Sequence, residues 1–222
     1  MRSDLKKQAS LGKIFPYNDP DDVCLKNMDR TWKQTIDTEV KNSDLSLDKL
    51  KEIRKNAYNY WRPASNAATH LILANLIQDR YSFYFGTTSS SPQTGKQFQF
   101  LKNLGYRIRL LHITAPDDVR WQSIVKRDQH FVQTTESDTK TKGELVPQRI
   151  LDTYLKYADE IEFYYRNNVD ESAILAATWI RTDEGKLCIH HPAAYSKMIN
   201  IHNEICQRIQ RSDLLWEIAI GQ

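Results

Sequence analysis

One apolar and aromatic run that ends at a glycine constrains this chain more than any other stretch. Residues 81–85 read Tyr-Ser-Phe-Tyr-Phe, which is typical of a strand, and Gly86 stops the run. The hydroxyl-rich residues 87–91 follow, and a helix is predicted from Gln93 on. Because ligands bind at the carboxyl ends of parallel strands, this loop is predicted to contact a substrate or a phosphate. A polar turn that binds no ligand is the alternative.

Size and charge indicate an ordinary globular domain. The 222 residues suffice for a single domain, and charged and apolar residues make up 27% and 40% of them. The formal net charge of +3 is too small to predict nucleic-acid binding without a local basic patch, and we find no such patch. No apolar run is long enough to cross a bilayer, so no membrane partner is expected.

The first residues and the cysteines bear on the compartment and on metal binding. The start of the chain lacks the apolar core of a signal peptide, and Cys24, Cys188 and Cys206 have no metal-ligand spacing. The pair His190 and His191 has no carboxylate or cysteine near it in the sequence, so no metal site is predicted. These features favour a reduced, cytoplasmic location.

An acid ahead of the aromatic run stands where site residues are often found. Residues 23–26 (Val-Cys-Leu-Lys) are predicted to form a short strand, and Asp29 follows in the predicted loop before a helix. A helix N-cap is the alternative role for Asp29.

Pro63 is predicted to separate an amphipathic helix from a second helix that ends at Gln78. Arg62, Ser65 and Asn66 would then lie at the start of the second helix. Unpaired backbone N–H groups and the helix dipole favour an anion at such a place. The sequence therefore predicts that these three side chains contact a charged substrate.

Helices and strands are predicted to alternate after the hydroxyl-rich loop. A helix should end at Gly105, a strand should follow over residues 107–115, and another helix over residues 117–131. With residues 81–85, the strand would form a right-handed βαβ crossover.

The last third of the chain combines helices with a hairpin. Residues 134–143 have no apolar period and are predicted to form a mobile loop, whereas residues 147–166 are predicted to form a long helix. Gly185 indicates the turn of a hairpin, and residues 195–211 a final helix. The apolar tail, residues 214–220, must dock or pair with something.

The order of these segments resembles that of the zeta toxin family of P-loop kinases. The resemblance runs from Val23 to Ile189. It rests on five motifs: Asn27-Met-Asp-Arg-Thr-Trp-Lys-Gln, Arg62-Pro-Ala-Ser-Asn, Phe85-Gly-Thr-Thr, Ile124-Val-Lys-Arg-Asp and Thr139-Lys-Thr-Lys-Gly-Glu-Leu-Val-Pro. Family members transfer the γ-phosphate of ATP to the sugar hydroxyl of UDP-N-acetylglucosamine, and relatives act on other nucleotide-like substrates.

The resemblance implies an α/β fold: a parallel-sheet, P-loop-kinase-like core with flanking helices and a C-terminal hairpin plus helix. It implies a single domain over residues 1–222, with a variable N-terminal segment (1–22) and a C-terminal helical extension (193–222). It also implies ATP and Mg²⁺ as cofactors, a nucleotide-like substrate, and an antitoxin or another protein as partner.

The resemblance also assigns roles to single residues. Asp29 would be the base for the substrate hydroxyl, and Arg127 would act on the transferred phosphate. Lys142 would bring a second cation to the phosphates from a lid. The substrate would contact six further residues: Arg62, Ser65, Asn66, Thr87, Thr88 and Ser89.

Three departures from the family pattern bear on activity. No G-x-x-x-x-G-K-[ST] motif occurs in the chain, and residues 10–14 (Ser-Leu-Gly-Lys-Ile) hold only its Gly-Lys. Phe85 replaces the acid of the family's Glu-Gly-Thr signature, and residues 88–91 lack the arginine expected there. Two functions therefore stay open: an ATP-dependent kinase whose P-loop lies upstream or on another chain, and a non-catalytic binding module or effector that keeps the fold.

Overall fold

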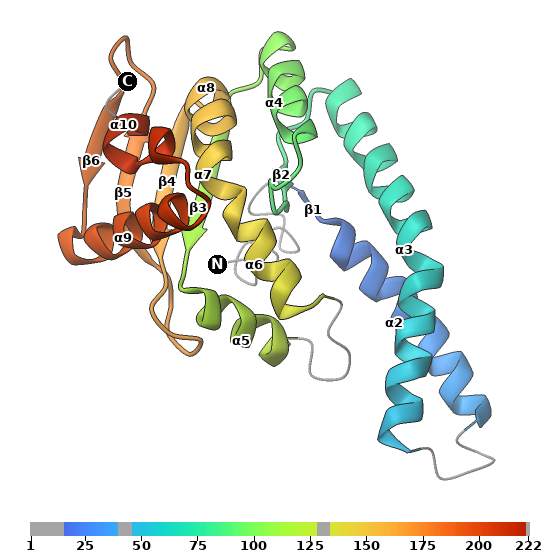
Figure 1. Ribbon diagram of the computed structural model, residues 1–222. Coiled ribbons are helices and arrows are strands. Elements are labelled where there is room, and N and C mark those ends of the chain that lie inside the picture. Colours follow the sequence, from blue (N-terminus) through green and yellow to red (C-terminus); the bar gives the residue numbers. More distant parts are fainter. Residues whose placement is uncertain (1–15, 40–45, 128–133, 221–222) are drawn as a thin grey trace. The chain divides into compact units, whose positions relative to one another are not determined.

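A computed structural model describes residues 16–39, 46–127 and 134–220 of the chain (Figure 1). The chain divides into two compact units. The described part of the first unit ends at Thr87, and that of the second comprises residues 88–127 and the residues from Thr134 on.

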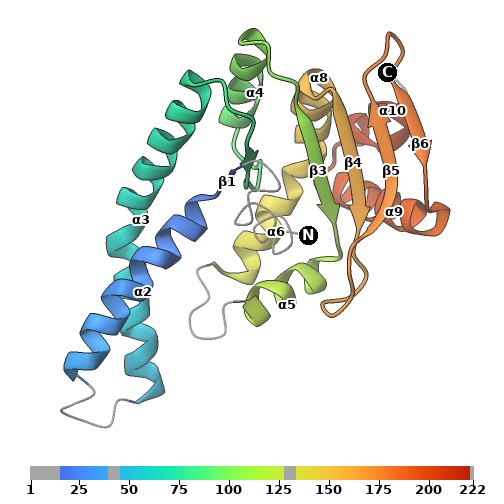
Figure 2. The ribbon, with the colours of Figure 1, turned by 180° about the vertical axis from the view of Figure 1, so that it is seen from behind.

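The first unit is a helical hairpin with a small parallel sheet. Its elements in chain order are β1 (Tyr17–Asn18), α2 (Pro20–Glu39), α3 (Leu47–Gln78) and β2 (Tyr84–Phe85). Strands β1 and β2 pair in parallel, with Tyr17 opposite Tyr84. The helices lie side by side over a small core of Cys24, Met28 and Ala57 (Figures 1 and 2).

The strand predicted over residues 23–26 is wrong, because these residues belong to α2. The Asp19 carboxylate accepts a hydrogen bond from the backbone N–H of Asp21 at 2.9 Å, which caps the start of the helix. Cys24 and Met28 are four residues apart and lie on the helix face that packs against α3. The apolar residues that suggested a strand therefore form a helical stripe.

The break predicted at Pro63 is also wrong, because α3 is one helix of 32 residues with Pro63 inside it. A proline in a helix interior removes one backbone hydrogen bond and costs about 3 kcal/mol. Packing on both sides of the proline offsets this cost, since Trp61 joins the core of the hairpin and Ser65 is fully buried. No helix therefore begins at Arg62, Ser65 and Asn66.

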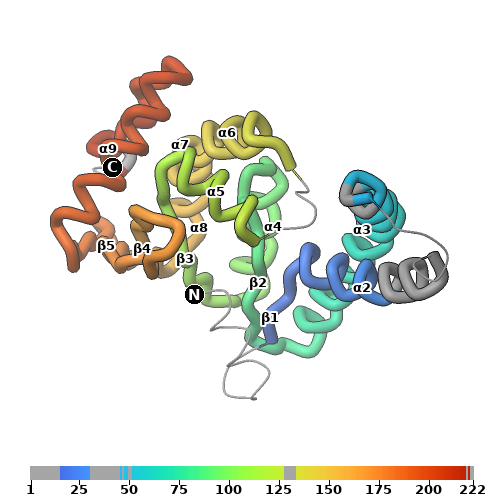
Figure 3. The backbone as a smooth tube through the Cα atoms, turned by 90° about the horizontal axis from the view of Figure 1, so that it is seen from below, coloured from blue at the N-terminus to red at the C-terminus, as the bar shows by residue number. Residues whose placement is uncertain are grey.

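The second unit contains most of the secondary structure. Its elements in chain order are α4 (Gln93–Asn103), β3 (Arg109–Thr114), α5 (Asp117–Arg127), α6 (Glu136–Glu144), α7 (Val146–Arg149), a π-helical turn (Ile150–Tyr154), α8 (Leu155–Tyr157), β4 (Glu160–Tyr165), β5 (Ile174–Ile180), β6 (Lys186–Ile189), α9 (Pro192–Arg208), a 3-10 turn (Ser212–Leu214) and α10 (Trp216–Ile220). Figure 3 shows α5, α6 and α7 next to one another.

The four strands of the second unit form one sheet in the order β3-β4-β5-β6. Strands β3 and β4 are parallel, and the other two pairs are antiparallel. Figure 2 shows the sheet in front of α9 and α10. The predicted α/β class is confirmed, with parallel pairing in both sheets. The predicted βαβ crossover is wrong, because among the described strands β2 pairs with β1 and β3 pairs with β4.

Two further predictions fail in the middle of the second unit. The long helix predicted over residues 147–166 ends near Ala158, and β4 follows. Ile161, Phe163 and Tyr165 are buried at every second position, so the apolar period is that of a strand. The mobile loop predicted over residues 134–143 is largely helix α6, which the Thr135 side chain caps.

The predictions that rest on local turn residues agree with the structure better than those that rest on apolar periods. Helix α4 begins at Gln93 as predicted, and Gly105 follows its end with a positive φ of 83°. The hairpin of β5 and β6 turns at Gly185, whose φ is 71°. The final helix is confirmed as α9, which begins three residues earlier than predicted.

The apolar tail docks on the second unit, as expected. Leu214 is fully buried and Trp216 is 3% exposed. The Nε2–H of His202 donates to the Leu214 carbonyl at 2.7 Å, and the Trp216 indole N–H donates to the Tyr195 hydroxyl at 2.8 Å. The core that these residues join consists of Ile108, Ile150, Tyr154, Ala158, Ile161, Phe163, Tyr165, Ala176, Ala177, Trp179, Ala194, Met198 and Trp216.

Candidate functional site

A buried carboxylate stands at the end of the first strand. Asp19 directly follows β1 and is 7% exposed. One carboxylate oxygen accepts the backbone N–H of Asp21 at 2.9 Å, and the other accepts the Tyr17 hydroxyl at 3.1 Å. The strand, the acid and α2 thus follow one another directly, and the acid itself caps the helix. This is the strand–acid–helix arrangement that the sequence led us to expect around Asp29.

Gly86 lies against this carboxylate. Its backbone N–H donates to the Asn18 carbonyl at 3.0 Å, which continues the parallel pairing past β2. A Cβ atom at Gly86 would overlap the Asp19 carboxylate and lie 2.7 Å from the Tyr17 hydroxyl. The close approach therefore requires glycine. It brings the start of the hydroxyl-rich loop, Gly86 and Thr87, next to the acid.

Asp29 lies elsewhere, in the interior of α2, and its side chain is exposed. It neither follows a strand nor caps the helix, so both roles weighed for it depended on the incorrect strand prediction. The sequence did contain the right signal. In Asn-Asp-Pro, residues 18–20, an acid precedes a proline at the first position of a helix, and two more acids occupy the first turn.

Arg62 lies close to this acid. Its guanidinium forms an ion pair with the Asp21 carboxylate, and it lies over the Tyr58 ring at 5.7 Å from the centroid. The backbone of Asp21 is itself bound to Asp19. Arg62 therefore binds the same residue whose backbone N–H binds Asp19, although Arg62 lies within a helix and not at a helix start.

Ser65 and Asn66 lie in the interior of α3 and not at a helix start. Ser65 is fully buried between the helices, and Asn27 donates to its hydroxyl at 3.4 Å. Its carbonyl accepts the Thr69 hydroxyl at 2.7 Å. Asn66 is half-buried in mid-helix. The backbone donors expected at a helix start are absent, because α3 passes through this segment without interruption.

The rest of the hydroxyl-rich loop opens the second unit. Thr88 is exposed, and its hydroxyl lies 3.1 Å from that of Ser90. Ser89 is 4% exposed with a positive φ of 51°, and it hydrogen bonds to Tyr154. Burial raises the pKa of the Tyr154 hydroxyl, although the bond to Ser89 opposes this. Thr88 is therefore open to solvent, whereas Ser89 anchors the loop to the core.

The two predicted phosphate-binding cations lie on neighbouring helices of the second unit. Arg127 is the last residue of α5, and Lys142 lies in the last turn of α6. Both side chains are exposed. Asp19, Asp29 and Arg62 belong to the first unit, so the structure groups the acid with one cation and, separately, the other two cations with each other.

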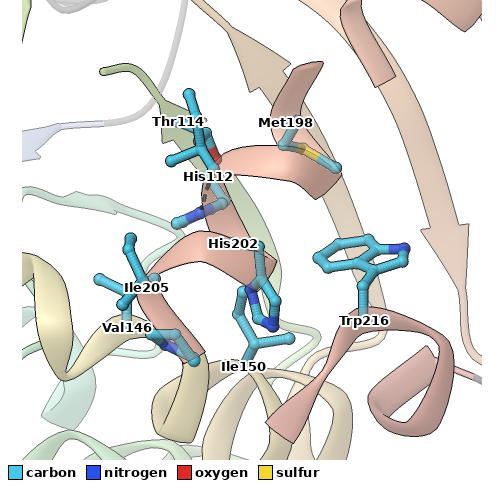
Figure 4. A pocket seen from close by; sticks show the side chains of 10 residues that line it. His112, Thr114, Val146, Ile150, Met198, His202, Ile205 and Trp216 are labelled. Atoms are coloured by element: carbon cyan, nitrogen blue, oxygen red, sulfur yellow. Dashed lines mark hydrogen bonds between the residues drawn. The ribbon is translucent and has the colours of Figure 1, made fainter. Parts of the chain in front are cut away.

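A small cavity lies inside the second unit, and none of the residues predicted to bind substrate or phosphate lines it (Figure 4). Its volume is about 30 Å³, which is room for about one water molecule. His112 and His202 line it, together with apolar residues such as Ile150 and Trp216. Burial, helped by His202 and Arg120, lowers the pKa of His112 to about 4. The cavity is too small for a nucleotide.

The chain matches a known protein family over most of its length. The sequence model of the zeta toxin family matches residues 47–189, which is more than half of the chain. The chain belongs to the zeta toxin family. The match begins in α3 and ends with β6, so it includes Arg62, Gly86, Arg127 and Lys142. Asp19 and helix α9 lie outside it.

A solved structure also matches this zeta toxin family member. It comes from a study of the PezAT chromosomal toxin–antitoxin system of Streptococcus pneumoniae. The two chains are 12% identical, with a TM-score of 0.35, over 93% of this chain and 80% of that chain. No protein with a curated description matches the zeta toxin family member.

Neither a metal cluster nor a membrane span occurs in the part of the chain that the structure describes. Within residues 16–39, 46–127 and 134–220, no group of three or more histidine, cysteine, aspartate or glutamate side chains is arranged to hold a metal ion. In the same residues, every helix is too short or too polar to pass through a bilayer. We therefore assign no residue of the zeta toxin fold to Mg²⁺.

Proposed function

We propose that this zeta toxin family member is a phosphotransferase, which passes the γ-phosphate of ATP to a hydroxyl of a nucleotide sugar or a related nucleotide. The observation that carries the proposal is the Asp19 carboxylate packed on Gly86, at the carboxyl ends of two parallel strands. Membership of the family supports the same reaction class.

Asp19 would orient the substrate hydroxyl and accept its proton late in the reaction. Phosphoryl transfer has a loose transition state, so positioning and charge neutralisation contribute most of the rate. The Tyr17 hydroxyl and the Asp21 backbone N–H hold the carboxylate in one orientation. A carboxylate held in one orientation is placed to accept the proton of a hydroxyl that binds beside it.

The substrate would be held by groups around this acid. Arg62 supports binding of the substrate's phosphates, because Asp21 and the Tyr58 ring already hold its guanidinium in place. Thr87 and Thr88 are exposed hydroxyls beside Gly86 and suit a sugar or a phosphate oxygen. The buried Ser65 and Ser89 would act only by supporting these neighbours.

ATP would supply the phosphoryl group, and the exposed cations Arg127 and Lys142 fit its negative charge. The chain has no G-x-x-x-x-G-K-[ST] motif, so no residue is assigned to cradle the β- and γ-phosphates. Asp29 remains a second candidate for the base, but its exposed place in mid-helix gives it less support than Asp19.

A non-catalytic role is the second candidate function. The missing Walker motif and Phe85 in place of the family's acid favour a binding module or effector that keeps the fold. A protein partner such as an antitoxin fits both functions, since the matched solved structure belongs to a toxin–antitoxin system. In the binding module, Thr87 and Thr88 would hold a ligand without transfer.

The test compares two acids of one helical hairpin. Asp19→Asn should lower phosphoryl transfer from labelled ATP to a panel of nucleotide sugars by about 100-fold or more, because the base is lost while the shape is kept. The matched variant Asp29→Asn should change the rate by less than about twofold, since that side chain is exposed. Circular dichroism would check that both variants fold.

Three results would contradict the proposal. Equal rates for Asp19→Asn and the parent chain would exclude Asp19 as the base, and a large loss in Asp29→Asn alone would move that role to Asp29. Absence of transfer in the parent chain, together with no ATP binding that Arg127→Ala weakens in calorimetry, would favour the binding module.

A further inference from the structure

An arginine from outside the family match joins the two helices that carry the phosphate-binding cations. Arg208 is the last residue of α9. Its Nη1 lies 3.1 Å from an Asp117 carboxylate oxygen on α5, and its Nε lies 3.0 Å from a Glu144 carboxylate oxygen on α6. One guanidinium therefore bridges α5 and α6, and its fork-shaped set of N–H donors suits two acceptors at once.

A second arginine lies beneath this bridge. Arg120 of α5 forms an ion pair with the same Asp117. Its guanidinium packs on Gly143 of α6, where a Cβ atom would come within 2.7 Å of the Arg120 Cζ. Burial lowers the pKa of Arg120, and the neighbouring Arg208 lowers it further. The two carboxylates balance the two arginines, so all four charges depend on one another.

In the part of the chain that the structure describes, polar contacts hold helix α6. Its sequence, Glu-Ser-Asp-Thr-Lys-Thr-Lys-Gly-Glu, contains no apolar side chain, and Gly143 is the buried residue in it. A helix without an apolar stripe gains no hydrophobic packing, so polar contacts must set its position. Those contacts are the approach of Arg120 to Gly143 and the ion pair of Glu144 with Arg208.

The bridge lies close to Lys142 on α6, whereas Arg127 lies at the opposite end of α5 from it. Lys142 is two residues before Glu144 in the last turn of α6, and Arg127 ends the helix that Asp117 begins. Helices of this length are rigid on the scale of a side chain, so a contact at one end sets the direction of the other. Binding of Asp117 and Glu144 to one guanidinium therefore fixes the backbone of α6 that carries Lys142 and the direction of α5, which ends at Arg127.

We propose that Arg208 is a positioning residue for phosphoryl transfer, which holds α6 on α5 and so fixes where Lys142 lies relative to Arg127. This inference rests on the proposed function for its catalytic part. Its structural part, the fixing of α6 by a helix outside the family match, stands independently. Arg208 itself touches neither substrate nor cofactor in this scheme.

The test combines backbone exchange with kinetics. Arg208→Gln and Glu144→Gln should each raise amide hydrogen exchange in residues 136–144 by about two- to fivefold, as expected for a partly exposed ion pair, while exchange in α4 stays constant. Both should lower kcat/KM for ATP by about tenfold, because misplaced cations stabilise the transition state less. Arg208→Lys should restore only part of the rate, since an ammonium lacks the fork.

Arg211→Gln is the matched control. Arg211 pairs with Asp213 on the exposed surface just after α9 and reaches neither α5 nor α6 through that pair. It should leave both the exchange of α6 and kcat/KM unchanged. A loss of stability alone would lower the melting temperature without raising exchange selectively in α6, so the two readouts separate positioning from unfolding.

Each outcome decides one part of the inference. Faster exchange in α6 with a lower kcat/KM supports it, and unchanged exchange in both Arg208→Gln and Glu144→Gln overturns it. Faster exchange with unchanged kcat/KM overturns the catalytic part. If the parent chain transfers no phosphate, the proposed function fails with that catalytic part, whereas faster exchange in α6 would still support its fixing by Arg208.

Discussion

At the scale of single residues, Asp19 shows that tertiary contacts decide which carboxylate is buried and oriented. Asp19 and Asp29 lie in the same part of the sequence, and only one is buried. Asp19 is held by a tyrosine hydroxyl and a backbone N–H, with Gly86 leaving room for it. Position 86 requires glycine because the Asp19 carboxylate occupies the space that a Cβ atom would fill.

His112 predicts a dependence of stability on pH. Burial, His202 and Arg120 lower its pKa to about 4 in the folded protein, against about 6.5 in the unfolded chain. The unfolded chain therefore binds more protons between these values, so stability is full above pH 6.5, falls as the pH drops and levels below pH 4. From pH 7 to pH 5, we expect a loss of about 2 kcal/mol in the free energy of unfolding.

Urea unfolding at several pH values measures this loss. His112→Gln should flatten the profile, although the buried His202, whose pKa burial also lowers, keeps part of the slope. The exposed His70 offers a control, and His70→Gln should keep the full slope. A slope that is the same in His112→Gln and in the parent chain would contradict the prediction.

At the scale of elements, long-range packing decided the secondary structure of some segments more than their local sequence pattern did. Helix α6 has no apolar period, and it forms where Arg120 and Arg208 contact it. The strand β4 reads locally as the end of a helix, but it pairs with β3 and β5 and buries alternate residues. The neighbouring strands β3 and β5 decided that this segment is a strand, because the backbone hydrogen bonds of a strand require a second segment.

Pro63 offers a test of the continuous helix α3. The proline lies inside the helix with an exposed side chain, so Pro63→Ala restores one backbone hydrogen bond without filling any core space. The variant should raise the free energy of unfolding of the first unit by about 1–3 kcal/mol. Thermal unfolding, with amide exchange read near residues 61–67, measures this gain. Destabilisation by alanine would indicate two helices separated at Pro63, as the sequence first suggested.

At the scale of the whole molecule, the core of the second unit extends past the family match. The match ends at residue 189, yet Met198 and Trp216 belong to the same core as Phe163 of β4. The Trp216 ring lies 5.1 Å from the Phe163 ring, and its indole N–H binds Tyr195. The C-terminal residues are therefore part of the folding unit, and they also carry Arg208.

Loss of the docked tail should unfold the second unit readily. Trp216→Ala removes a ring that is 3% exposed and should cost about 3–5 kcal/mol in the free energy of unfolding. Ile218→Ala in the same short helix, where the side chain is 42% exposed, should cost less than about 1 kcal/mol. Urea unfolding followed by circular dichroism compares the two. Equal costs would show that the tail does not dock.

The sequence by itself determined the features that depend on neighbouring residues. The helix from Gln93, the glycine turns at Gly105 and Gly185, and the final helix follow from backbone preferences and short apolar periods. The order of motifs sufficed for the family, which the match over residues 47–189 confirms. These signals act within a few residues, so a linear reading contains them.

Only the tertiary structure decided which acid is buried and which polar segment is ordered. The Asp19 carboxylate fits only because Gly86, far along the chain, has no side chain. Helix α6 is held by the ion pair of Glu144 with Arg208 of α9. Strand β4 exists because β3 and β5 exchange backbone hydrogen bonds with it. Each of these outcomes depends on contacts between distant segments, whose free energies no local pattern contains.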